Sequence, residues 1–298
     1  MVARHCPGFF YNKEQTIVGY SPSIYQLSIQ NNIYCYTAPM QQLLEVALTA
    51  GREAGKAIFA MREGVTHEIK SDGSPVTSAD IRAHDIILEH LTPTGIMILS
   101  EESDGIPLPY PEYLWVIDPI DGTKDYMQGG TDFSVMIALL HNGAPVLGVV
   151  DAPALNATFY ATEGEGAYKI VDGITTKLTG KNERPLTLQF LCSVNHFAPY
   201  METVTNTLHA EKTPRGSVGV KAGLLGDAYG DFFFNRGKLG EWDTCAPEII
   251  LKEAGGVVSD CEGNALVYGN PEHRHQNGIL FAQKECYEEV LQAVMGAE

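Results

Sequence analysis

The sequence has few basic residues. It contains 20 Lys and Arg against 37 Asp and Glu, so its formal net charge at pH 7 is −17. A field of this sign repels nucleic acids and anionic membranes unless a basic patch or a bound cation reverses it locally. We therefore expect neither nucleic acid nor membrane as a partner. An acidic protein that acts on a phosphate needs metal ions, which become the largest local positive charges in its site.

Paired cysteines and long apolar segments are also missing. The six cysteines are scattered, with no Cys-x-x-Cys pair, and this usage favours reduced thiols and a cytoplasmic location. No apolar stretch approaches the length of a membrane span, and the N-terminal residues lack a signal-peptide pattern. With 44% hydrophobic residues, the 298-residue chain can bury one large core or the cores of two domains.

Hydrophobic periodicity divides the chain into three parts. Residues 1–38 follow no clear period and are predicted to be an N-terminal extension, partly disordered. Residues 39–181 are predicted to form an α+β domain, with a helix over 40–61, a second helix capped by Thr77 or Ser78, and strands of an antiparallel sheet. Residues 182–298 alternate strands and helices, which predicts a second, smaller α/β domain.

Carboxylates stand at the ends of several predicted elements. Six of them occupy such positions: Asp80, Glu101, Glu102, Asp118, Asp121 and Asp243. Apolar strands seldom end in this way, because a half-buried carboxylate without a partner is unfavourable or changes its pKa. Converging acids need cations, and an all-oxygen ligand set without His or Cys is what hard ions such as Mg²⁺ prefer.

The segment "DPIDGT" suits a metal centre in its details. Pro119 fixes the backbone between two acids, and its neighbour Ile120 can offer a main-chain carbonyl as a further oxygen ligand. Gly122 permits a sharp turn and the close approach of a ligand. Thr123 places a hydroxyl and a backbone N–H beside the metals. Two metals bridged by Asp118 would position a water, lower its pKa and hold a leaving oxygen.

Four blocks in this order, "PVTSAD", "EE", "DPIDGT" and "EWDTCAP", resemble the inositol monophosphatase superfamily of Mg²⁺-dependent, often lithium-sensitive phosphatases. The resemblance covers residues 40–298. It implies a layered α+β or α/β sandwich of the order αβαβα, with an N-terminal antiparallel-sheet domain and a smaller C-terminal α/β domain. It also implies two or three Mg²⁺ ions and a small-molecule phosphate ester as the substrate.

The resemblance implies a set of metal ligands. The first ion would be held by oxygens of three residues: Glu101, Asp118 and the main chain of Ile120. The second would be held by three carboxylates: Asp118, Asp121 and Asp243. Glu101 would also help to hold a third, weaker ion, and Glu102 would support the ligands from behind.

The resemblance also implies the catalytic groups. Thr123, linked to Asp80, would orient the attacking water and help to deprotonate it, and Glu101 completes the catalytic set. The main chain around Gly122 and Thr123 would receive the phosphate. The reaction would be an in-line displacement in which electrostatic positioning supplies most of the stabilisation.

The residues after this motif bear on the substrate. "DGTKDY" differs from the "DGTTNF" usual in inositol phosphatases and resembles the CysQ-type 3'(2'),5'-bisphosphate nucleotidases. That branch implies hydrolysis of 3'(2')-phosphoadenosine 5'-phosphate to AMP. Its second phosphate and base would be held around Gly216, Ser217 and Lys221, with Lys124 and Arg215 as candidate cations. One departure is the segment "CSVNH", which lacks the arginine of the "SRSH" frequent in that branch.

Several alternatives remain open from the sequence. Inositol monophosphatase and histidinol-phosphate phosphatase belong to the same superfamily, and the latter also carries "DGTK". A non-catalytic metal or nucleotide sensor is the alternative of another class, disfavoured because no metal-ligand position is replaced. The acids could merely cap turns and helices, and Lys221 could be an exposed helix lysine. The oligomeric state is open, with a homodimer among the options.

Overall fold

A computed structural model describes residues 29–30, 33–34, 39–62, 67–69, 75–103, 105–106, 108–195 and 197–297. Of the predicted extension it describes only β1 (Ile29–Gln30) and β2 (Ile33–Tyr34), an antiparallel pair. The rest of that prediction lies outside the described residues. Met40–Glu298 form one compact unit by themselves.

A seven-stranded sheet is the first layer of strands in this unit, in the order β11-β10-β9-β8-β7-β6-β5. Its strands are β5 (Met97–Ser100), β6 (Tyr113–Asp121), β7 (Ser134–His141), β8 (Ala144–Ala152), β9 (Ala157–Thr162), β10 (Gly166–Val171) and β11 (Ile174–Leu178). All neighbours are antiparallel except β5 and β6. The predicted antiparallel sheet therefore carries one parallel edge strand, because β5 and β6 are joined by a long crossing segment instead of a hairpin.

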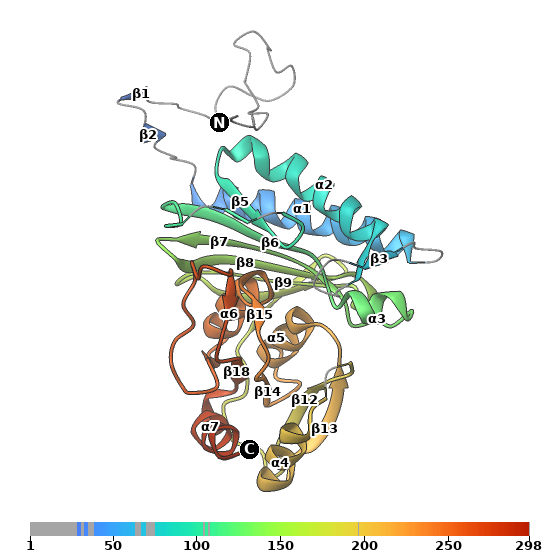
Figure 1. Cartoon of the computed structure of the whole chain (residues 1–298), viewed down its shortest axis with the longest axis vertical. Coiled ribbons are helices and arrows are strands. Elements are labelled where there is room, and N and C mark those ends of the chain that lie inside the picture. Colours follow the sequence, from blue (N-terminus) through green and yellow to red (C-terminus); the bar gives the residue numbers. More distant parts are fainter. Residues whose placement is uncertain are drawn as a thin grey trace, which may run out of the picture. The chain divides into compact units, whose positions relative to one another are not determined.

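Two helices cover one face of this sheet, α1 (Met40–Met61) and α2 (Ser78–Leu91) (Figure 1). Helix α1 has the predicted bounds, and Gly51 lets it lie close to the sheet, since a Cβ there would be 3.2 Å from Val149 Cγ1. Thr77 caps α2: its hydroxyl accepts from the N–H groups of Ala79 and Asp80. In return, the Asp80 carboxylate accepts from the Thr77 N–H. Before it, β3 (His67–Ile69) pairs with β4 (Pro75–Thr77).

A second, five-stranded sheet has the order β13-β12-β14-β18-β16. Its strands are β12 (Gln189–Ser193), β13 (Glu211–Arg215), β14 (Phe232–Asn235), β16 (Val257–Ser259) and β18 (Ile279–Ala282). The core around it is rich in aromatic rings, including the stacked pair Phe190–Phe232 with centroids 4.9 Å apart. Helices α4 (Pro199–Leu208) and α7 (Tyr287–Gly296) lie on its outer side (Figure 1).

Helices α5 (Val218–Gly226) and α6 (Cys245–Glu253) form the layer between the two sheets (Figure 1). Helix α6 can approach β8 closely because Gly148 has no Cβ. A Cβ there would lie 2.8 Å from the Ala246 carbonyl oxygen. The layers therefore run helices, sheet, helices, sheet, helices, which confirms the expected αβαβα sandwich. The predicted boundary near residue 182 falls between β11 and β12, and the division into two domains stays a prediction.

No helix in the part of the chain that the structure describes has both the length and the apolar character needed to cross a membrane.

Candidate active site

The parallel edge of the seven-stranded sheet brings two acidic strand ends together. In the register of β5 and β6, Ser100 lies opposite Ile117. The Glu101 N–H continues this pairing and donates to the Ile117 carbonyl at 3.2 Å. Glu101 therefore follows β5 at the level where Asp118 lies in β6. Asp118 itself is buried, with 1% of its surface exposed.

A bulge in β6 places both acids of "DPIDGT" on one face of the sheet. Asp118 lies opposite Met136 and Asp121 opposite Ser134, so three steps along β6 match two along β7. In a regular strand, residues three apart point to opposite faces. The extra residue restores the same face, and Pro119 suits it because proline has no N–H to donate to the ladder.

Asp118, Asp121 and Asp243 form one acidic cluster. One carboxylate oxygen from each lies within 4.8 Å of the others. Asp243 comes from the 3-10 helix η3 (Glu241–Asp243), where its Oδ2 accepts from the Gly240 N–H at 2.7 Å. Both Asp118 oxygens are buried, and neither has a hydrogen-bond partner among the residues that the structure describes. A buried carboxylate with neither proton donor nor cation is unfavourable, so this oxygen-only set fits a hard divalent cation.

The electrostatics of the metal-free cluster agree with this fit. Burial raises the pKa of Asp118 well above its ordinary range, and the charges of Glu101, Asp121 and Asp243 raise it further. Desolvation, followed by the charge of Asp121, likewise raises the pKa of Asp243. Burial also raises the pKa of Asp121, but hydrogen bonds from Ser217 and Gly219 oppose the shift. The cluster therefore needs protons or cations to stay together.

The start of α5 holds Asp121. The Ser217 hydroxyl donates to Asp121 Oδ2, and the Gly219 N–H donates to the same oxygen at 2.8 Å. Since its only proton goes to Asp121, Ser217 accepts from the Ser134 hydroxyl at 2.9 Å and from the Val220 N–H at 3.0 Å. The Ser217 hydroxyl thus uses its one donor and both acceptor positions on other residues of the chain. Its contact with a substrate phosphate stays a prediction.

Lys221 lies in the interior of α5, with 5% of its surface exposed. Its Nζ donates to the Gly216 carbonyl at 3.0 Å and lies 5.0 Å from the centroid of the Phe233 ring. Burial lowers the pKa of Lys221, and the charge of Asp121 raises it. The alternative that Lys221 is an exposed helix lysine is therefore wrong, whereas its contact with a second phosphate stays a prediction.

Asp80 and Thr123, the predicted water-orienting pair, lie near the cluster. Asp80 is buried, caps α2 through Thr77 and adds to the rise in the pKa of Asp118. Capping and proximity to the cluster thus coexist. The Thr123 hydroxyl donates to the Ile120 carbonyl at 2.9 Å. Their catalytic assignment stays a prediction.

The remaining predicted residues surround the motif. Gly122 has a φ of 87° and precedes the short helix α3 (Thr123–Met127); a Cβ there would lie 2.7 Å from the Asp132 carbonyl. Lys124 is exposed on α3. Glu102 is half-buried, and its N–H donates to Ser100 Oγ at 3.2 Å. The Gly216 N–H donates to Asp132 Oδ2 at 3.1 Å.

Two acids that hold the site together were not predicted from the sequence. Asp125 Oδ2 accepts from the Asp132 N–H at 2.8 Å, and the Asp132 carbonyl accepts from the Ser217 N–H at 3.1 Å. The segment after the motif is thereby tied to the start of α5. The "KDY" that follows "DGT" was the available signal for Asp125, but nothing near Asp132 in sequence marks it.

Glu241 is a third residue that sequence reasoning missed. It is fully buried two positions before Asp243. It accepts from the Tyr110 hydroxyl at 2.6 Å and from the N–H groups of Gly269 and Asn270 at 3.0 and 2.8 Å. It therefore joins the start of η3 to two distant loops, and the glutamate in "EWDTCAP" was its only sequence signal.

The five-layer fold and the oxygen-only cluster at its strand ends define a class of protein, the layered α/β enzymes that carry a divalent-metal centre. The profile of the inositol monophosphatase family matches residues 39–296, and the chain belongs to this family. It is therefore a phosphatase that acts on small phosphate esters, in a family whose enzymes use divalent metal.

Three relatives show which members the chain is similar to. The 3'(2'),5'-bisphosphate nucleotidase CysQ of Aggregatibacter actinomycetemcomitans is 37% identical over 240 residues, 78% of this chain and 88% of the relative. CysQ of Salmonella typhimurium is 34% identical over 235 residues, 76% of this chain and 94% of the relative. The crystal structure of CysQ from Bacteroides thetaiotaomicron has a TM-score of 0.72 at 28% identity, covering 82% of this chain and 98% of that one.

Proposed function

We propose that this phosphatase is Mg²⁺-dependent and hydrolyses 3'(2')-phosphoadenosine 5'-phosphate to AMP and phosphate. The observation that carries the metal dependence is Asp118: its two buried oxygens have no hydrogen-bond partner in the described part of the chain, and it clusters with Asp121 and Asp243. The substrate rests on "DGTKDY" and on the similarity to nucleotidases named CysQ. We also place the enzyme in the cytoplasm, because the four cysteines among the described residues are free thiols.

The proposed metal ligands are the carboxylates and the one carbonyl that surround the bulge. They are Glu101, Asp118, the main chain of Ile120, Asp121 and Asp243. When bound there, Mg²⁺ supplies positive charge to the phosphate and raises the acidity of a water. The carboxylates stay ionised in that state, because each then has a cation at hand. The negative charge of the chain thus becomes compatible with an anionic substrate.

Thr123 and Asp80 are proposed to orient the attacking water. The Thr123 hydroxyl donates its hydrogen to the Ile120 carbonyl, so towards a water its oxygen can only accept a hydrogen bond. Asp80 is held in place by the Thr77 N–H and hydroxyl at 2.7 and 2.6 Å. A fixed acceptor pair of this kind would orient a water, and the Asp80 carboxylate would take up its proton.

The phosphate is proposed to bind along the main chain of Gly122 and Thr123. Lys124 follows Thr123 in α3. The start of α5, with Gly216, Ser217 and Lys221, lies beside Gly122 in space, since a Cβ at Gly122 would be 3.4 Å from Ser217 Cβ. Lys221 has no carboxylate within ion-pair distance among the described residues. Its positive charge is therefore available to attract a bound anion. This is the proposed place of the second phosphate.

Phosphate release tests the proposal. We expect Mg²⁺-dependent release from 3'-phosphoadenosine 5'-phosphate at a higher kcat/KM than from inositol 1-phosphate or histidinol phosphate. Asp118→Asn should lower turnover by about 10³-fold or more, because a metal ligand supplies several kcal/mol of transition-state stabilisation. The matched control is Asp85→Asn, an exposed carboxylate on α2.

Three results would overturn the proposal or part of it. Absence of Mg²⁺-dependent release from all three esters would remove the metal-dependent reaction. Hydrolysis that is unchanged in Asp118→Asn would remove the site. A preference for inositol 1-phosphate or histidinol phosphate would keep the site and replace the substrate.

A further inference from the structure

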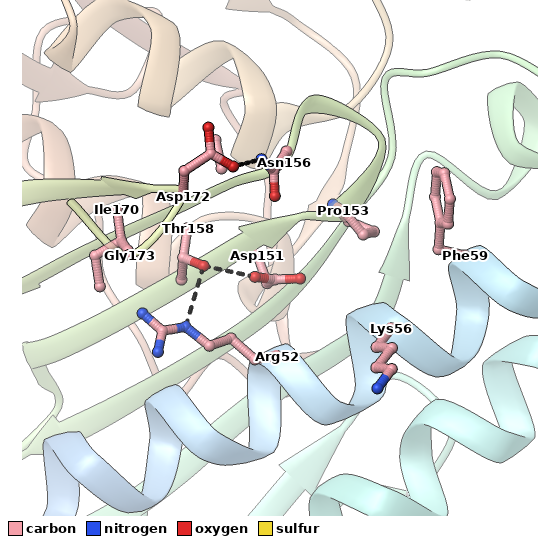
Figure 2. Close-up of a pocket in the computed structure, with 11 residues that line it drawn as sticks. Arg52, Lys56, Phe59, Asp151, Pro153, Asn156, Thr158, Ile170, Asp172 and Gly173 are labelled. Atoms are coloured by element: carbon pink, nitrogen blue, oxygen red, sulfur yellow. Dashed lines mark hydrogen bonds between the residues drawn. The ribbon is translucent and has the colours of Figure 1, made fainter. Parts of the chain in front are cut away.

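A hollow of about 450 Å³ lies between α1 and the ends of three strands of the seven-stranded sheet (Figure 2). It is on the face of the sheet opposite the acidic cluster. Asp121 and Ser134 point to the face that α5 covers, whereas Asp151, opposite Val135 in the register, points to the face that α1 covers. The hollow is therefore separate from the candidate active site. Its charged and polar lining residues are Arg52, Lys56, Asp151, Asn156, Thr158 and Asp172.

Asp151 is a buried acid that has one oxygen without a donor. Its surface is 6% exposed, and the Thr158 hydroxyl donates to Oδ1 at 2.7 Å. No donor among the described residues bonds Oδ2, which points away from Thr158 in Figure 2. Gly55 of α1 makes room for this oxygen, since a Cβ there would overlap it. Oδ2 is not among the fully buried atoms that lack a partner, and Asp151 lines the hollow, so this oxygen is accessible to a donor from a ligand.

Two cations stand one helical turn apart beside this acid. Arg52 and Lys56 both come from α1 and are exposed at the mouth of the hollow (Figure 2). The Arg52 Nε donates weakly to Thr158 Oγ1 at 3.4 Å. Lys56 makes no ion pair with any residue in the described ranges. Both side chains therefore have donors to spare for an anionic group.

The rest of the lining is apolar. Phe59 continues the same face of α1 and is 39% exposed, and Pro153 and Ile170 contribute from the strand ends. Exposed aromatic surface beside polar groups is typical of a small-ligand site. The hollow thus offers three kinds of contact within a space of small-molecule size: a free acid, a pair of cations and an apolar wall.

The combination selects the charge of the ligand. A simple anion is repelled by Asp151 and by the chain's net charge of −17, and a simple cation is repelled by Arg52 and Lys56. A zwitterion matches both groups at once. We propose that this hollow binds a free α-amino acid, with its ammonium on Asp151 Oδ2, its carboxylate on Arg52 and Lys56, and its side chain against Phe59. This inference does not depend on the phosphatase substrate.

Calorimetric titration of the full-length protein with each of the twenty L-amino acids tests the proposal. We expect at least one to bind with a Kd of about 10 mM or tighter. Asp151→Asn and the double variant Arg52→Gln with Lys56→Gln should each weaken that binding by at least about tenfold, because each leaves one charge of the ligand unpaired. The control is Glu53→Gln, since Glu53 lies on the same helix but bonds His90 of α2.

The double variant changes only exposed side chains, so it keeps the test valid if Asp151→Asn fails to fold. Absence of binding by every amino acid, or binding that neither variant weakens, would overturn the proposal. Titration with propionate, a carboxylate without an ammonium group, completes the test: binding of this anion as tight as that of the amino acid would overturn the zwitterion assignment.

Discussion

At the scale of single residues, the Ser217 hydroxyl connects the acidic cluster to α5. It donates to Asp121 and accepts from Ser134 and Val220. Hydrogen bonds to charged groups contribute more than neutral ones, about 1.5–3 kcal/mol each. The side chain therefore fixes the orientation of a proposed metal ligand, which is a different task from contacting the substrate.

Ser217→Ala separates the two tasks. We expect the Mg²⁺ concentration at half-maximal activity to rise about tenfold, because Asp121 loses its donor, while KM at saturating Mg²⁺ changes little. Ser259→Ala removes another buried hydroxyl, bonded to the Asp260 carbonyl in the second sheet, and serves as the control. A raised KM with an unchanged Mg²⁺ requirement would instead assign Ser217 to the substrate.

The acids of the cluster predict an unusual dependence of stability on pH. Their pKa values lie above the ordinary 3.8 in the metal-free protein, so between 3.8 and the raised values the folded state binds more protons than the unfolded state. Stability must therefore fall as pH rises through this window, by up to about 1.4 kcal/mol per pH unit for each proton.

Thermal unfolding in EDTA checks the sign of this effect. We expect the Tm of the metal-free protein to rise, relative to that of Asp118→Asn, as the pH is lowered through the raised pKa values toward 3.8, and Asp118→Asn to show a shallower slope. Saturating Mg²⁺ should flatten the wild-type slope, since the cation replaces the proton. Equal slopes for wild type and Asp118→Asn in EDTA would contradict the prediction.

At the scale of elements, the close approach of α5 to β7 sets the geometry of the cluster. A Cβ at Gly219 would lie 2.6 Å from Ser134 Oγ and 2.7 Å from Met136 Sδ. Gly219 also donates its N–H to Asp121. The spacing between helix and sheet and the position of the acid therefore depend on the same residue.

Gly219→Ala is expected to destabilise the protein by about 1–3 kcal/mol, the usual cost of overpacking. It should also raise the Mg²⁺ requirement, because α5 must move away from Asp121. Gly296→Ala in α7 is the control, since a Cβ there meets nothing within 4 Å. Urea unfolding measures the first effect and a Mg²⁺ titration of activity the second. Full stability in Gly219→Ala would show that the helix tolerates the added methyl group.

The local chemistry of the cluster could be predicted from the sequence, but its geometry could not. Oxygen ligands and a turn-forming Gly122 are properties of single residues and their neighbours. The bulge that aligns Asp118 with Asp121 exists only in the pairing of β6 with β7, which no residue of "DPIDGT" encodes alone. The burial of Lys221 likewise depends on Phe233, which reaches it only through the second sheet.

Two strands lie where polar side chains hide any strand pattern. Strand β13 reads "EKTPR", whose charges and proline are atypical of a strand, yet it pairs in parallel with β12 at the edge of the second sheet. Strand β11 is largely exposed and is held by its ladder with β10. Both are edge strands, where pairing with one neighbour suffices and hydrophobic alternation is not required.

At the scale of the whole molecule, the middle helices serve both sheets. Helix α6 packs on β8 and β9 of the first sheet and on β16 of the second, and α5 contacts β7, β8 and α6. The apolar residues of the first sheet that face this layer include Met136, Val150 and Phe159. The apolar face of each sheet is thus covered by helices that also pack against the other sheet.

Separate expression of residues 40–181 and 182–298 tests this dependence. We expect neither fragment to unfold cooperatively alone, because the first lacks the helices that cover its sheet and the second leaves those helices exposed. Near-ultraviolet circular dichroism and urea titration provide the measurement. A sharp unfolding transition in the 40–181 fragment would support two independent domains.

The same shared layer imposes an order on biosynthesis. Strands β5 to β11 leave the ribosome long before α5 and α6, so the growing chain exposes the bare apolar face of its first sheet while about seventy further residues are made. Asp243 emerges later than Asp118 and Asp121, and the nascent chain therefore acquires its complete cation-binding cluster only when that face is about to be covered. Chaperone capture of this protein should accordingly concentrate on chains stalled between β11 and α6.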